Sequence, residues 1–487
     1  MAQTRSAAPA RAGRRPPAPT PAPGGGIDHA DVQGIVGNGY GRRREALFLG
    51  LRVDDGAAGR AFLAELLPRV TSMADSSSGR ALNVALSHAG LARLGLPQAA
   101  LDGFSLEFAG GMARPTRSAF LGDVDEQAPS TWAWGGPDNP CVDVLLLLYA
   151  GTCEELDAHA AVVRGLFPAD GVVEVATLPT TTLTPYDHLG FADGISQPAV
   201  AGLMGDQDGA VPLGEFLLGY PNAYGRLTRR PLLPAAADPG GVLPPVRRGE
   251  APGSVDLGRN GTYLVARTLA VDVAAFRDHT ERWAARTGLS AGQVAAKMVG
   301  RWPSGTSLTV SPDADPGTGP GPVDNDFRYH RDGDALGLGC PVAAHVRRAN
   351  PRDSLDPRPG SEAAVRVNDR HRLIRRGRQY GPLPDGELGL HFLCLNANIS
   401  RQFEFVQHTW LNNPAFAGLQ DSPDPIAGYH PPGGGGVFPV PADPVRHRLL
   451  DLPRFMQLRG GGYFFLPGVR ALHHLASGSA AGREDPR

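Results

Sequence analysis

The segment Glu45–Val53, with the sequence EALFLGLRV, carries the aromatic and branched apolar side chains that are typical of a buried β-strand. Asp54, Asp55 and Gly56 follow it, and these residue types favour turns. Apolar residues then recur at helical spacing over residues 60–70. The first structural unit that the sequence predicts is therefore a strand followed directly by a helix.

Units of the same kind recur along the chain. In the first half, Thr152 is expected to cap a helix that ends near residue 167, with Glu155 completing a capping box. The other expected elements of this half are strands at 80–87, 142–149 and 172–177 and a short helix at 91–96. The second half offers strands at Thr262–Val271 and 388–395 and helices at 273–286 and 400–411. We therefore expect an α+β fold of two similar halves, with antiparallel sheets and helices on one face.

The composition limits the classes of function. Of the 487 residues, 64 are glycine and 46 are proline, which together make up about 23%, while hydrophobic residues make up 41%. This combination predicts a folded body with long loops, at 238–256, 311–324 and 431–444. With 47 basic and 49 acidic residues, the chain lacks the basic excess of a nucleic-acid binder. No apolar run reaches the length of a membrane span.

The termini and cysteines suggest a location. Residues 1–26 contain no large aliphatic or aromatic side chain, and the Arg14–Arg15 pair is followed by prolines where an export signal would be apolar. We expect disordered tails at 1–26 and 476–487, an N-terminal half at 27–200 and a C-terminal half at 201–475. The four cysteines form no C-x-x-C pair, and three of them lie beside strongly apolar runs, which predicts buried free thiols and favours a cytoplasmic protein. They are Cys141, Cys153, Cys340 and Cys394.

The first segment that suggests chemistry is 190–198, with the sequence GFADGISQP. Gly190 and Gly194 flank Asp193, and glycines let a backbone turn tightly and approach a flat ligand closely. From the local pattern alone, an ordinary surface turn at Asp-Gly is the favoured interpretation.

The second and third segments are basic. In 340–352, His345 precedes Arg347 and Arg348, so an iron ligand would lie beside cations able to pair with haem propionates. A histidine with a packing role is the alternative. Residues 371–381 include Arg375 and Arg376, and taken alone this segment indicates a solvated basic turn.

Taken together, the three segments resemble the dye-decolourising peroxidase family of haem enzymes, whose signature G-x-x-D-G corresponds here to Gly190, Asp193 and Gly194. The resemblance runs from about residue 45 to 466, and the length is similar to that of the larger, loop-rich bacterial members. It implies two ferredoxin-like halves of the dimeric α/β-barrel type. Haem b would lie between the sheet and the helices of the C-terminal half.

The resemblance also implies roles for individual residues. His345 would ligate the iron, and Asp424 would accept a hydrogen bond from its other ring nitrogen, although an Asp-Pro turn is an equal alternative for Asp424. Asp193 would move the proton of hydrogen peroxide, and Arg375, with Arg376 as its competitor, would stabilise the developing charge. Leu390 and Phe392 would form the wall of the pocket, with His391 on the opposite face of the strand.

The function that the resemblance implies is a peroxidase that reduces hydrogen peroxide and oxidises dye-like or phenolic donors by one-electron steps through a ferryl intermediate. Large donors would require electron transfer through a surface aromatic residue, for which Tyr380, Trp410 and Tyr429 are the candidates by position. The alternative is a haem-binding protein for sensing, storage or iron handling, which would not need both Asp193 and Arg375. The oligomeric state, a monomer or a dimer, is left open.

Overall fold

The computed structural model describes residues 26–478 except for 76–78, 204–208, 247–248, 318–324, 434 and 443. The expected disordered tails at 1–26 and 476–487 lie outside this part, apart from Gly26 and residues 476–478. Ala476 and Ser477 belong to helix α11 (Val469–Ser477), so the predicted C-terminal tail begins too early. Leu472 and Leu475 of the same helix are buried in the core, which explains why the helix extends this far.

Four strands of the first half form one side of a nine-stranded antiparallel sheet, in the order β4-β1-β3-β2. The elements along the chain are β1 (Glu45–Val53), α1 (Gly56–Leu66), β2 (Ala81–Leu86), α2 (His88–Arg93), α3 (Gln98–Leu101), α4 (Leu106–Gly110), α5 (Pro115–Leu121), β3 (Val144–Ala150), α6 (Cys153–Arg164) and β4 (Val172–Pro179). A β-α-β-β-α-β chain with sheet order 4-1-3-2 is the ferredoxin-like topology. The strand–helix units predicted for this half are thus confirmed.

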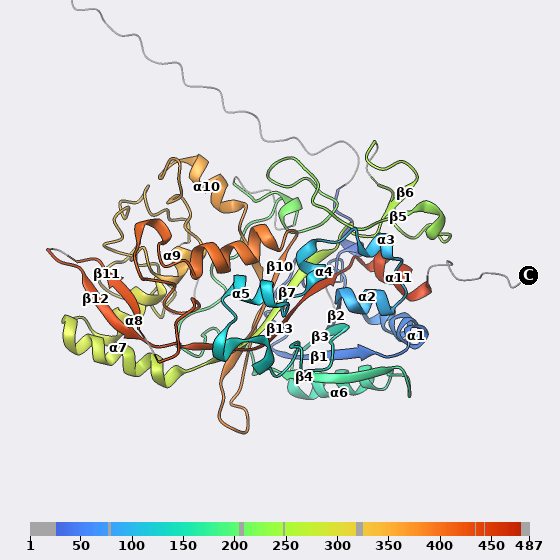
Figure 1. Cartoon of the computed structure of the whole chain (residues 1–487), viewed down its shortest axis with the longest axis horizontal. Helices are drawn as coiled ribbons and strands as arrows, with labels where there is room; N and C mark the ends of the chain where they lie inside the picture. Colours follow the sequence, from blue (N-terminus) through green and yellow to red (C-terminus); the bar gives the residue numbers. More distant parts are fainter. Residues whose placement is uncertain are drawn as a thin grey trace, which may run out of the picture.

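The second half repeats this arrangement with the sheet order β13-β7-β10-β8, in which β9 also pairs with β10. Its elements are β7 (Thr262–Val271), α7 (Val273–Thr287), α8 (Ala291–Val299), α9 (His345–Ala349), α10 (Glu362–Asp369), β8 (Ile374–Arg375), β9 (Arg378–Tyr380), β10 (Gly389–Asn396), the helical segments η7 (Ser400–Glu404) and η8 (Val406–Leu411), and β13 (Met456–Leu466). Phe465 of β13 pairs with Leu86 of β2, which joins the two halves into one sheet. In Figure 1 the helices α7, α8 and α10 lie at the opposite end of the molecule from α1 and α6.

Both faces of the first-half sheet are buried. Leu49 and Leu51 of β1 pack in one core with Phe62 and Leu63 of α1, whereas Phe48 packs in the core of the opposite face. Asp55 caps α1 by accepting a hydrogen bond from the Ala58 amide, so the helix begins four residues earlier than its apolar pattern suggests.

The capping box expected at helix α6 is only half formed. The Thr152 hydroxyl accepts a hydrogen bond from the Glu155 amide at 3.2 Å. The Glu155 carboxylate accepts from the amide of Gly151, at 3.1 Å, and not from that of Thr152.

Several loops contain more structure than the sequence predicts. Within the expected loop 431–444, β11 (Gly436–Val440) pairs with β12 (His447–Leu452) as a hairpin, and Phe438 and Leu449 are fully buried. Likewise, β6 (Ser254–Asp256), at the end of the expected loop 238–256, pairs with β5 (Leu232–Pro234). The predicted helix at 400–411 is wound mostly as a π-helix.

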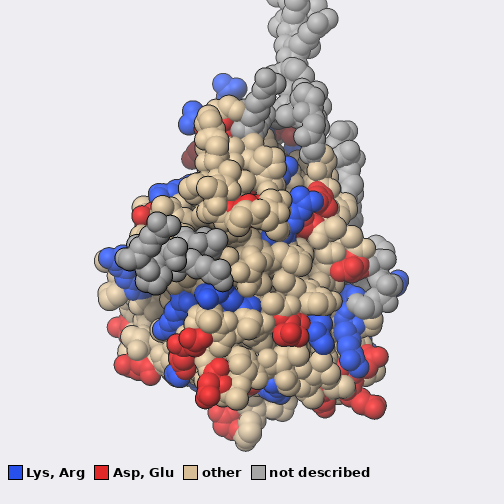
Figure 2. Space-filling model, turned by 90° about the vertical axis from the view of Figure 1, so that its right-hand side faces the viewer, with Lys and Arg blue, Asp and Glu red and all other residues tan. Residues whose placement is uncertain are grey.

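All four thiols are free, but only Cys340 and Cys394 are buried, so the prediction of burial is wrong for Cys141 and Cys153. Among the described residues, no helix is both long and apolar enough to cross a membrane. On the face shown in Figure 2, basic and acidic side chains are interspersed.

Candidate active site

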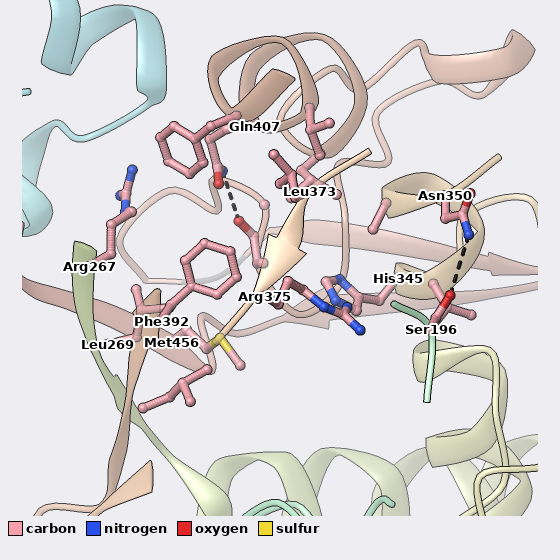
Figure 3. Close-up of a pocket in the computed structure, with 18 of the residues that line it drawn as sticks. Ser196, Arg267, Leu269, His345, Asn350, Leu373, Arg375, Phe392, Gln407 and Met456 are labelled. Carbon is pink, nitrogen blue, oxygen red and sulfur yellow. Dashed lines mark hydrogen bonds between the residues drawn. The ribbon is translucent and has the colours of Figure 1, made fainter. Parts of the chain in front are cut away.

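A cavity lies between the sheet and the helices of the second half, as the sequence analysis expects for the haem. Phe392 pairs with Arg267 and Leu390 with Leu269 across β10 and β7, so these alternate residues share one face of the sheet. Arg375 of β8 and Met456 of β13 also line this wall, and His345, Val346, Ala349, Phe403 and Val406 line the helical side. Figure 3 shows this arrangement, with His345 and Asn350 across the cavity from Leu269 and Phe392.

His345 is the first residue of α9, and the Asp424 carboxylate fixes the orientation of its ring. Nδ1 lies 3.0 and 3.1 Å from the two carboxylate oxygens of Asp424. Because an ionised carboxylate only accepts hydrogen bonds, Nδ1 must carry the proton, which leaves the Nε2 lone pair free for a metal. Within the described part of the chain, Nε2 has no hydrogen-bond partner, and His345 lines the cavity. The geometry therefore pairs the two residues as the resemblance implies.

Asp424 is completely buried and does not itself line the cavity. Its Oδ1 also accepts hydrogen bonds from the amides of Ile426 (2.9 Å) and Ala427 (2.8 Å). Burial alone would raise the pKa of Asp424, but the His345 ring, the Arg348 guanidinium and the Ala427 amide outweigh it and bring the pKa below its usual value. The carboxylate is therefore ionised, as an acceptor for Nδ1–H must be.

Asp193 lies on an anchored loop at the cavity. Its amide donates to the Pro185 carbonyl at 3.0 Å, and the exposed carboxylate accepts from the Gly194 amide at 2.6 Å. Asp187 fixes the start of the loop by accepting from the Phe191 amide at 2.9 Å. Burial, and to a smaller extent the charge of Asp193, raise the pKa of Asp187.

The two signature glycines differ in their positions. Both have a positive φ, 89° for Gly190 and 78° for Gly194, which glycine adopts without strain. Gly194 lines the cavity and Gly190 does not, so a cofactor contact of Gly190 stays a prediction. The structure instead assigns Gly190 a conformational role.

Gln197 holds Arg375 in place, a function that the sequence did not reveal. Its Oε1 accepts from the Arg375 amide at 3.0 Å, and its Nε2 donates to the Arg375 carbonyl at 3.2 Å. The loop that carries Asp193 is thereby tied to the strand that carries Arg375. The Arg375 side chain lines the cavity, and no ion pair joins it to Asp193 among the described residues.

Arg376, the competitor of Arg375, points to the other face of the sheet. Its guanidinium donates to the carbonyls of Ile35 (2.7 Å) and Val36 (2.8 Å) and does not line the cavity. His391 also lies on that face, where it contacts Thr268 and Pro179, as expected from strand alternation. The geometry thus favours Arg375 over Arg376.

Arg347 and Arg348 do not line the cavity, so the structure offers no support for the expectation that they contact a propionate. The Arg347 guanidinium donates to the carbonyls of Asp334 (3.0 Å) and Cys340 (2.7 Å) and lies over the Tyr329 ring. The Arg348 guanidinium donates to main-chain carbonyls, among them those of Ser422 (2.8 Å) and Asn413 (2.6 Å). Both side chains are buried structural residues.

Two other arginines line the cavity in their place, Arg301 and Arg372. Burial lowers the pKa of each to about 10, and the nearby positive charges of Arg352 and Arg375 contribute to the lowering. Neither forms an ion pair among the described residues. The nearby Asp369 carboxylate opposes this lowering for Arg372. Positive charge gathered at a cavity wall without close ion pairs suits an anionic ligand such as the propionate edge of haem.

The chain is similar in sequence and fold to known peroxidases. No family model matches the chain. The multifunctional dye peroxidase DyP2 of Amycolatopsis sp. is 30% identical over 393 residues, which cover 71% of this chain and 74% of that protein. A dye-decolorizing peroxidase of Exidia glandulosa is 28% identical, with 91% of this chain and 86% of that protein covered. The crystal structure of a fungal DyP-type peroxidase from Auricularia auricula-judae superposes with a TM-score of 0.73 at 25% identity, covering 93% of this chain and 100% of that one.

Proposed function

Because this chain belongs to the dye-decolourising peroxidase family, a family of haem enzymes that use hydrogen peroxide, we propose that His345 holds haem b and that Asp193 and Arg375 carry out the acid–base chemistry. The observation that carries the proposal is the His345–Asp424 pair, whose free Nε2 faces the cavity that Asp193 and Arg375 also line.

The residues present fit a haem. Nε2 of His345 offers a neutral nitrogen ligand, and Leu269, Leu390, Phe392 and Met456 provide an apolar wall for a flat ring. Arg301 and Arg372 offer cations without carboxylate partners among the described residues. The bound haem supplies the iron and the electrons that split the O–O bond of hydrogen peroxide.

The protein's contribution is the movement of a proton and the stabilisation of charge. As a carboxylate, Asp193 would accept a proton from one oxygen of hydrogen peroxide and deliver it to the other oxygen, which would leave as water. The Arg375 guanidinium stabilises the negative charge that develops on the peroxide.

We further propose that small aromatic donors are the reductants and that the enzyme works in the cytoplasm, which the four free thiols support. The halves at 27–200 and 201–475 remain our proposed division of the chain, supported by the repeated 4-1-3-2 strand order.

Haem binding tests the proposal. The purified protein, titrated with haem b, should develop a Soret band at one haem per chain, and His345→Ala should lower this occupancy at least tenfold. His330→Ala serves as a control, because His330 is absent from the cavity wall. Full occupancy and an unchanged spectrum in His345→Ala would show that the ligand is misassigned.

A further inference from the structure

A second carboxyl group, that of Asp187, lines the same cavity wall as Asp193. The two residues lie on the two arms of one narrow loop, in which Tyr186 and Ala192 form an antiparallel bridge. Asp187 follows one bridging residue in the chain and Asp193 follows the other. The loop that presents Asp193 to the cavity therefore presents a second acid beside it.

The main-chain pairing brings the two carboxyl groups to one face of the loop. The Asp187 amide donates to the Phe191 carbonyl at 2.8 Å, so these two residues lie opposite each other. The Asp193 amide donates to the Pro185 carbonyl at 3.0 Å in the same way. Because alternate residues share a face, Asp187 and Asp193 are diagonal neighbours, whose Cα atoms are about 7–8 Å apart in such a pair. One carboxylate can repel another at this separation.

The two carboxyl groups differ in their surroundings. Asp193 is exposed, whereas Asp187 is half-buried, and its Oδ1 accepts a hydrogen bond from the Phe191 amide at 2.9 Å. Burial raises the pKa of Asp187 against the effect of this hydrogen bond, and the charge of Asp193 raises it further. Asp187 therefore keeps its proton at a pH at which an ordinary Asp has lost it.

No basic side chain neutralises Asp187 by an ion pair in the part of the chain that the structure describes. The other charged side chains on the cavity wall are those of Asp123, Arg267, Arg301, Arg372 and Arg375. His188, the next residue in the chain, contacts the Tyr380 carbonyl through Nε2 at 3.0 Å. Among ionisable groups, Asp193 has the largest effect on Asp187, so the two acids form an electrostatic pair.

Resting on the proposed function, we propose that Asp187 is a positioning residue for the peroxide reaction, which anchors the loop of Asp193 and holds a proton beside it. While Asp187 is protonated, Asp193 carries the single negative charge of the pair and can pass its proton on. When Asp187 loses its proton to water, the second negative charge makes Asp193 retain the proton that it must deliver. The same charge opposes the stabilisation that Arg375 gives to the peroxide.

The test separates the charge of Asp187 from its hydrogen bond. Asp187→Asn keeps the shape and the oxygen that accepts from the Phe191 amide but cannot ionise. Asp187→Ala removes the oxygen as well. Asp278→Asn is the matched control, because Asp278 is exposed on α7 and absent from the cavity wall. The first readout is the rate of the peroxide reaction of each haem-loaded protein in stopped flow, from acid to neutral pH.

The second readout does not depend on turnover. It is the infrared band of the protonated Asp187 carboxyl group, identified by its absence from Asp187→Asn, followed as the pH is raised. The band should disappear at a lower pH in Asp193→Asn than in the wild type, because the neighbouring negative charge is gone.

The wild-type rate should fall about three- to tenfold as Asp187 ionises, which corresponds to a coupling of about half to one pKa unit. Asp187→Asn should react like the wild type in acid and should not show this fall. Asp187→Ala should be slower at every pH because the loop loses an anchor, and Asp278→Asn should behave like the wild type.

The same pH profile in Asp187→Asn as in the wild type would overturn the proposal, since the residue would then act through its hydrogen bond alone. An infrared band that disappears at the same pH with and without the Asp193 charge would overturn it too. If the haem-loaded wild type does not react with peroxide at any pH, the proposed function fails, whereas the infrared titration still decides whether the two acids are coupled.

Discussion

Replacing Asp424 with asparagine should loosen the haem and make it easier to reduce. The substitution keeps the shape of the side chain but removes the charge that faces Nδ1 of His345 at 3.0 Å. Asp424 is fully buried, so no solvent screens the loss. A hydrogen bond to a charged group contributes about 1.5–3 kcal/mol, and loss of such a partner typically weakens metal binding about 10- to 100-fold.

The assay is the transfer of haem to excess apomyoglobin, followed through the Soret band, together with the reduction potential of the iron. We expect Asp424→Asn to release haem about 10–100 times faster and to have a higher potential, because a neutral amide makes the imidazole a poorer electron donor. Asp278→Asn is the matched control, since Asp278 is exposed on α7. If Asp424→Asn retains haem and potential like the wild type, the hydrogen bond to His345 does not support the ligand.

Three further outcomes follow from other parts of the structure. Burial raises the pKa of Asp369 to about 6, so its contribution to stability is complete below pH about 4 and is lost as the pH rises through about 6. Asp369→Asn should therefore flatten the pH dependence of the free energy of unfolding over this window, by up to about 3 kcal/mol. If urea unfolding gives the variant the same change of unfolding free energy with pH as the wild type, this reasoning is wrong. Gln197→Ala removes both hydrogen bonds to the Arg375 main chain. In stopped-flow measurements at unchanged haem content, its reaction with peroxide should be about tenfold slower. An unchanged rate would show that strand β8 positions Arg375 without help from Gln197. Arg348→Met leaves several buried carbonyls unpaired and should lower the free energy of unfolding by about 3–5 kcal/mol. Arg358→Met, at an exposed position, should leave the free energy of unfolding almost unchanged. An Arg348→Met variant that is as stable as the wild type but loses haem would show that Arg348 contacts the haem.

The fold could be predicted because each half alternates apolar strands with amphipathic helices. The strand Glu45–Val53 has the predicted bounds, and the predicted helix follows it directly, although it begins four residues earlier than its apolar pattern suggests. The hairpin of β11 and β12 could not be predicted, because the glycines at 433–436 mask a strand whose partner, residues 447–452, is identified only by pairing.

The site was predicted in part. His345 faces the cavity, but Arg347 and Arg348 follow it on a helix that turns about 100° per residue, so their side chains point elsewhere. Neighbouring residues on a strand alternate, which is why Arg375 and Arg376 lie on opposite faces. Arg301, Arg372 and Gln197 reach the site from elements whose juxtaposition no local pattern reveals.

The central claim is that Asp193 and Arg375 together drive the reaction with peroxide. Stopped-flow mixing of hydrogen peroxide with haem-loaded Asp193→Asn and Arg375→Leu, each checked for full haem content, tests it most directly. We expect rates about 10²–10⁴-fold below the wild type for Asp193→Asn and about 10²–10³-fold below it for Arg375→Leu. Wild-type rates in both variants would contradict it.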